Sequence, residues 1–117
     1  MLRLALMLIT LLAPTFAFAH AVLMRSDPPV GGSVATSPPA LTITFSERVE
    51  PQFTTVKVLD PGNNPVAIGE LRPTGADGKT VAASLPKLAP GKYSVVYNAT
   101  SVDTHKTKGR YTFTVGR

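Results

Sequence analysis

The chain has 117 residues, carries 12 Lys and Arg against 7 Asp and Glu for a formal net charge of +5, and contains no cysteine. This length favours a single domain, and the lack of cysteine excludes a disulfide framework and thiolate-bound zinc or iron–sulfur centres. The basic residues are spread along the sequence and do not alternate with aromatic residues, so we expect an ordinary solvated surface and no nucleic-acid partner.

Residues 1–19 have the pattern of a secretory signal peptide. Arg3 gives a positively charged start, an almost wholly apolar run covers residues 4–12, and the A-F-A of residues 17–19 supplies the small residues that a signal peptidase reads. A retained membrane anchor is the alternative, but the apolar run is shorter than the roughly 20 residues that cross a bilayer. We therefore expect cleavage after residue 19, export, and one domain over residues 20–117.

The rest of the chain has the pattern of an all-β domain. Short runs alternate apolar and polar residues with a period of two, as expected for strands with one buried and one wet face, and clusters of Pro and Gly separate them as turns. The strongest runs are residues 41–46, 55–58, 93–98 and 111–115, and weaker ones are residues 21–24, 66–71 and 80–85. About seven short strands between turns predict an immunoglobulin-like Greek-key β-sandwich or barrel.

The alternation also predicts which side chains form the core. Six residues should be buried between two antiparallel sheets: Phe45, Val56, Tyr93, Val95, Tyr97 and Phe113. Tyr93 follows the turn Ala89-Pro90-Gly91, the place of the tyrosine corner in such sandwiches, so we expect it to have a structural role.

The sequence contains two histidines, and the first is His20, which signal cleavage would expose as residue one. An N-terminal histidine offers its α-amine and ring Nδ1 to the same metal ion. The free amine has an ordinary pKa near 8, so a metal displaces its proton far more easily than that of a lysine. The alternative is chance, because any residue can follow a signal site.

The second histidine lies in Ser101-Val102-Asp103-Thr104-His105. In an extended segment, residues two apart point to the same side, so the carboxylate of Asp103 and the imidazole of His105 would project together. This spacing alone is a weak signal, because many surface loops contain it. Its position just after a strand, where a sandwich gathers its loops, favours a site.

Together these residues offer one amine, two imidazoles and one carboxylate. Such nitrogen and oxygen ligands suit tetragonal Cu(II), which leads the divalent affinity order, whereas zinc, the main competitor, prefers a tetrahedron. Soft ligands for Cu(I) are scarce, because Met24 is the only methionine after residue 19.

Several segments occur in a distinctive order. They are His20-Ala21-Val22-Leu23, S-D-P-P-V-G-G at residues 26–32, L-T-I-T-F-S-E at residues 41–47, L-A-P-G-K-Y at residues 88–93, and S-V-D-T-H at residues 101–105 followed by Gly109 and Y-T-F-T-V at residues 111–115. Over essentially all of residues 20–117, this set resembles the CopC family of periplasmic copper-resistance proteins.

The resemblance implies a seven-stranded Greek-key sandwich or barrel in the bacterial periplasm, with Cu(II) bound by His20, Asp103 and His105. It implies that Glu47 is either a weak ligand or a hydrogen-bond acceptor for the amine. Some members have a second, Cu(I) site in a methionine-rich loop, but residues 51–75 contain neither methionine nor histidine. The family is often linked to an inner-membrane copper importer, CopD, so that partner is implied as well.

We therefore expect a protein that binds one Cu(II) for sequestration, trafficking or resistance, without a small-molecule substrate or catalysis. A copper mono-oxygenase, which also uses an N-terminal histidine, is the enzyme alternative. Asp103 would occupy the equatorial position that such an enzyme leaves open for oxygen. A metal-free structural sandwich is the other alternative, and copper titration separates the three.

Overall fold

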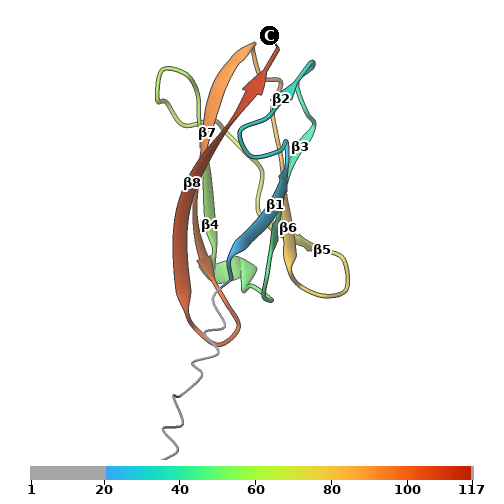
Figure 1. Cartoon of the computed structure of the whole chain (residues 1–117), viewed down its shortest axis with the longest axis vertical. Helices are drawn as coiled ribbons and strands as arrows, with labels where there is room; N and C mark the ends of the chain where they lie inside the picture. Colours follow the sequence, from blue (N-terminus) through green and yellow to red (C-terminus); the bar gives the residue numbers. More distant parts are fainter. Residues whose placement is uncertain (1–20, 117) are drawn as a thin grey trace, which may run out of the picture.

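The computed structural model describes residues 21–116, so the expected signal peptide and His20 lie outside the described residues. These residues form two packed sheets (Figure 1). The elements are β1 (Leu23–Asp27), β2 (Ser33–Val34), β3 (Ala40–Phe45), the 3-10 helix η1 (Pro51–Phe53), β4 (Thr55–Leu59), β5 (Arg72–Thr74), β6 (Thr80–Ser84), β7 (Gly91–Thr100) and β8 (Lys106–Val115). Between residues 21 and 116, no helix is long and apolar enough to cross a membrane.

One sheet has the strand order β1-β3-β6-β5, and the other has the order β2-β8-β7-β4. Neighbouring strands are antiparallel, except that β2 runs parallel to β8. Apart from the short β2, this is the strand order of an immunoglobulin constant-type sandwich. The expected all-β sandwich is confirmed.

The strands differ from expectation in three places. Between residues 21 and 116 there are eight strands rather than seven, because β2, with only two residues, is too short to show a periodic pattern. β8 starts at Lys106, before the expected run 111–115, because residues 106–110 contain no apolar side chain. The strand expected over residues 66–71 is wrong, and pairing starts only at β5. The amide of Val66 donates to the carbonyl of Val58 in β4, and that of Gly69 donates to Ser84 in β6. This segment therefore crosses from one sheet to the other and pairs fully with neither.

Apolar side chains from both sheets fill the space between them. The core includes all six residues that the alternation predicts, each at most 9% exposed: Phe45, Val56, Tyr93, Val95, Tyr97 and Phe113. The ring of Tyr93 stacks on that of Phe113 with centroids 5.6 Å apart, and Phe45 meets Tyr97 edge-on at 5.7 Å. Aromatic pairs in these arrangements stabilise a core beyond the area that they bury.

Tyr93 also fixes the turn that leads into β7. Its hydroxyl donates to the carbonyl oxygen of Ala89 at 2.7 Å. This bond forms the expected tyrosine corner, so the structural role of Tyr93 is confirmed. It anchors one end of β7, a long central strand whose other end leads into the D-T-H loop of residues 101–105.

Candidate metal centre

The D-T-H segment forms the loop that joins β7 to β8, residues 101–105. Within it, the amide of Ser101 donates to the carbonyl of His105 at 2.9 Å, and the amide of Thr104 donates to the carbonyl of Ser101 at 2.9 Å. Thr104 has a φ of +73°, in the left-handed region that closes tight turns. The loop is therefore a closed turn and not the extended segment that the spacing argument assumed.

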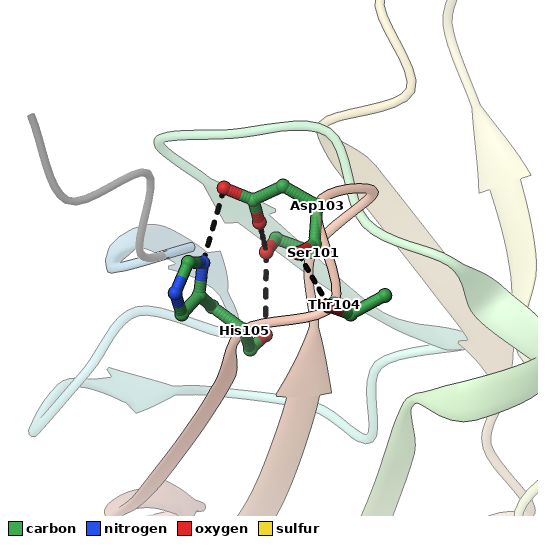
Figure 2. A network of polar contacts seen from close by, with 4 residues as sticks. All are labelled: Ser101, Asp103, Thr104 and His105. Carbon is green, nitrogen blue, oxygen red and sulfur yellow. Dashed lines mark hydrogen bonds and ion pairs between the residues drawn. The ribbon is translucent and has the colours of Figure 1, made fainter.

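Asp103 and His105 nevertheless meet, because the turn folds their side chains toward each other (Figure 2). Nδ1 of His105 lies 3.1 Å from Oδ2 of Asp103. The His105 side chain is 50% exposed and that of Asp103 is 39% exposed. A nitrogen and an oxygen donor thus sit together where an ion from solvent can reach both.

The separation of these two donor atoms suits a shared metal ion. Two donors that each lie about 2.0–2.2 Å from a metal, at a right angle to each other, are about 2.8–3.1 Å apart. The observed 3.1 Å falls within that range, and it is also the ordinary length of the hydrogen bond that joins His105 to Asp103, whose proton a metal ion would replace. Nδ1 of His105 and Oδ2 of Asp103 could therefore occupy adjacent positions of a square or tetragonal site without a large movement of the loop.

Ser101, which is buried, holds the carboxylate of Asp103 from behind. Its hydroxyl donates to Oδ1 of Asp103, and it also lies 3.2 Å from the carbonyl oxygen of His105 (Figure 2). The bond from Ser101 lowers the pKa of Asp103 below its ordinary value, and the neighbouring His105 lowers it further. The carboxylate is therefore kept charged and oriented. Sequence reasoning missed Ser101, although a serine two residues before an aspartate is a known local hydrogen-bonding pattern.

The beginning of the described chain lies at the end of β3. The amide of Val22 donates to the hydroxyl of Ser46 at 2.9 Å, and the amide of Ser46 donates back to the carbonyl of Val22 at 2.8 Å. Ala21 is fully buried. These bonds tie residues 21–22 to the F-S-E segment, which contains Glu47.

The segment after Glu47 in turn contacts the D-T-H loop. The amide of Val102 donates to the carbonyl of Arg48 at 3.1 Å, and Val49 forms a β-bridge with Ser101. Residues 21–22, the end of β3 and the β7–β8 loop therefore share one end of the sandwich, as Figure 1 shows. Three segments far apart in the sequence converge there.

Glu47 is exposed and is not gathered with Asp103 and His105 into a ligand set. Within residues 21–116, no group of three or more His, Cys, Asp or Glu side chains could hold a metal ion. The described residues thus provide a pair of donors. Any further nitrogen ligands have to come from elsewhere, and His20, which directly precedes Ala21, lies outside the described residues.

A family model described as the CopC domain matches residues 23–116. The chain belongs to the CopC family. The match covers every strand of both CopC sheets and the D-T-H loop.

Curated and solved relatives agree with this assignment. Protein YobA of Escherichia coli K12 is 38% identical over 113 residues, which span 96% of this chain and 90% of YobA. The crystal structure of CopC from Methylosinus trichosporium OB3b has a TM-score of 0.77 and 29% identity, and covers 82% of this chain and 93% of that one. That of PcoC, a methionine-rich copper resistance protein from E. coli, has a TM-score of 0.73 and 35% identity, and covers 83% and 99%.

One difference from PcoC follows directly from composition. PcoC is described as methionine-rich, whereas this chain has three methionines, and two of them, Met1 and Met7, fall in the expected signal peptide. The third, Met24, lies in β1 and is 65% exposed. This CopC-family chain therefore has few thioether donors, and the candidate donors brought together in the D-T-H loop are a nitrogen and an oxygen atom.

Proposed function

We propose that the processed protein is a periplasmic carrier of Cu(II) that holds one ion at the loop end of the sandwich. The observation that carries the proposal is the 3.1 Å separation between Nδ1 of His105 and Oδ2 of Asp103, which matches adjacent ligand positions. Membership of the CopC family, whose relatives include copper-resistance proteins, supports copper as the cargo.

The remaining ligands in this proposal come from His20. Its α-amine and ring nitrogen would complete an N₃O set with His105 and Asp103, which suits Cu(II). Residues 21–22 are bonded to Ser46, and the segment after Ser46 is bonded to the D-T-H loop, which supports the approach of residue 20 to that loop. Glu47 follows Ser46 and would accept a hydrogen bond from the amine or act as a weak ligand.

The proposal requires export and processing. We take residues 1–19 to be the signal peptide and residues 20–117 to be the copper-binding domain. The charged start, short apolar run and A-F-A sequence support cleavage after Ala19. Without cleavage the nitrogen of His20 is an amide, which is a far poorer ligand than an amine.

A carrier also has to release its ion. The half-exposed side chains of Asp103 and His105 support direct access by an acceptor. An inner-membrane copper transporter such as CopD would be that acceptor, and the cargo would pass through without chemical turnover.

The test is a Cu(II) titration of the processed protein, after mass spectrometry has identified its first residue. The variant carries one extra Gly before His20, which removes the amine from chelation but leaves both imidazoles. We expect Cu(II) affinity to fall by more than roughly 100-fold. That is the largest loss usually seen when a mutation removes a residue that only hydrogen-bonds a metal ligand. An extra Gly after Arg117 is the matched control and should change nothing.

Three outcomes would contradict the proposal. Equal affinity in the two extended variants would exclude the amine as a ligand. No copper binding by the processed protein would favour a metal-free structural sandwich. Peroxide-driven turnover by the copper-loaded protein would favour a mono-oxygenase instead of a carrier.

A further inference from the structure

The outer face of the sheet β2-β8-β7-β4 carries a concentration of positive charge. Five basic residues lie on β4, β7 and β8, and all five are exposed: Lys57, Lys92, Lys106, Lys108 and Arg110. These three strands contain no Asp or Glu. We call this surface the basic face. These residues are far apart in the sequence, and the fold brings them together on one exposed surface.

Strand geometry explains the clustering. Lys106, Lys108 and Arg110 are spaced by two along β8, so their side chains point to the same side, while Tyr111 and Phe113 point into the core. In the sheet register, Lys57 pairs with Val96, which pairs with Arg110, so a cation stands on each side of β7.

Little in the described part of the chain neutralises this charge. Within residues 21–116, none of the four lysines forms an ion pair, and Arg110 donates to the uncharged hydroxyl of Ser94 at 3.2 Å. Two acidic residues border the face. Asp60 lines a surface hollow with Lys92, and its carboxylate accepts from the amide of Asn64, while Glu70 lines another hollow with Lys57. The field of the basic face is therefore largely unopposed.

The composition of the basic face distinguishes between classes of partner. Protein–protein interfaces are enriched in aromatic residues and Arg and depleted in Lys. Here four of the five cations are lysines, which act as hydrated point charges, and the tyrosines of β7 and β8 point inward. The uncharged outward residues of β7 are small or polar apart from Val96. Such a face has no outward aromatic side chain that could fill a pocket on a protein partner. It suits a surface on which negative charge is spread widely.

We propose that the basic face is a docking surface for an anionic phospholipid bilayer. Each lysine or arginine near an anionic leaflet strengthens binding by about fivefold, over the short range that screening allows. Lys106 directly follows His105, so a protein that lies on this face presents the D-T-H loop beside the membrane surface. The proposal depends on the charges alone and not on copper.

The test is co-sedimentation of the processed protein with vesicles of phosphatidylglycerol or of phosphatidylcholine. We expect binding to the anionic vesicles only, and loss of that binding as salt is raised. The variant Lys57→Gln/Lys108→Gln/Arg110→Gln should bind about 100-fold more weakly, because it loses three fivefold contributions. Circular dichroism and thermal unfolding check that it is folded.

The matched control is Arg25→Gln/Arg72→Gln/Lys87→Gln, which removes the same charge from exposed residues of the other sheet and its loops. Its binding should change by less than about threefold, because Arg25 and Arg72 belong to the opposite sheet and Lys87 lies outside β4, β7 and β8, so salt screens these charges from a bilayer at the basic face.

Four outcomes would overturn the proposal. The first is no binding to anionic vesicles; if the protein is then retained on an acidic protein, the face belongs to a protein partner. The second is an equal loss of binding in the two triple variants. The third is binding that neither salt nor substitution weakens, as an uncleaved apolar leader would produce.

The fourth is competition by inorganic phosphate that exceeds competition by chloride at equal ionic strength, since it would indicate a discrete phosphate site.

Discussion

Ser101 is the residue on which the orientation of the candidate ligands depends. It is buried, it donates to Asp103, and it lies against the carbonyl of His105. Its hydroxyl is also the main cause of the lowered pKa of Asp103. A carboxylate whose pKa is lowered by folding stabilises the fold above its ordinary pKa, and that contribution is lost as pH falls through the lowered value.

We predict that Ser101→Ala weakens Cu(II) binding by about 10–100-fold, because groups that orient a ligand typically contribute that much. The pKa of Asp103 should rise toward its ordinary value, which NMR titration of the metal-free protein can follow. Ser33→Ala, at an exposed site in β2 at the opposite end of β8, is the control. Unchanged affinity in Ser101→Ala would show that the loop orients Asp103 without it.

At the scale of an element, β8 depends on a glycine, Gly109, at a position where a side chain would not fit. Gly109 pairs with Tyr97 across the sheet, and a Cβ at position 109 would overlap the phenol ring of Tyr97. An aromatic ring that covers a strand glycine compensates for the missing side chain. The glycine that belongs to the family-like motif therefore has a packing role.

We predict that Gly109→Ala lowers the free energy of unfolding by about 1–3 kcal/mol, the usual cost of forcing extra volume into a packed site. Thermal or denaturant unfolding measures the change. Gly62→Ala is the control, because its φ is not in the left-handed region and its nearest neighbour is the flexible side-chain end of Asn64. Chain entropy alone makes Gly→Ala stabilising, so an equal loss of stability at the two glycines would contradict overlap with Tyr97 as the cause of the cost at position 109.

The alternation of side chains was enough to predict the parts of the long strands in which apolar residues alternate, but not residues 106–110 of β8, which pair with β7 and contain no apolar side chain. Residues 93–98 and 111–115 alternate because β7 and β8 each have one face on the core, and their buried residues were identified correctly. Residues 66–71 failed because an apolar segment that crosses between sheets buries side chains without strand pairing. β2 was missed because its pairing with β8 is set by the tertiary fold.

The contact between Asp103 and His105 could be predicted from the sequence, but the backbone that produces it could not. The spacing of Asp103 and His105 suggested that they meet, and they do, but through a left-handed Thr104 that no periodicity reveals. The basic face escaped notice for a related reason. Lys57 and Arg110 become neighbours only through the register of two strands with β7.

At the scale of the whole molecule, the proposed site would link copper binding to proton binding. Cu(II) would have to displace protons from the amine and imidazole nitrogens, so affinity should fall as pH decreases between about 8 and 5. The lowered pKa of Asp103 keeps its carboxylate charged over that range, so the slope belongs to the nitrogen ligands. Titrations at several pH values should show a different slope for the Gly-extended protein, whose α-amine belongs to the added Gly and not to His20. Parallel slopes would contradict amine ligation.

The position of the loop end has a mechanical consequence. β1 belongs to one sheet, and the β7–β8 hairpin belongs to the other. A metal held jointly by the chain start and the hairpin would staple the two sheets together and close a loop of about 80 residues, a constraint on the unfolded chain on the order of 4 kcal/mol if it behaves like a disulfide. In a chain without cysteine, the bound metal would then serve as a reversible cross-link, and the protein would be most stable with the metal bound.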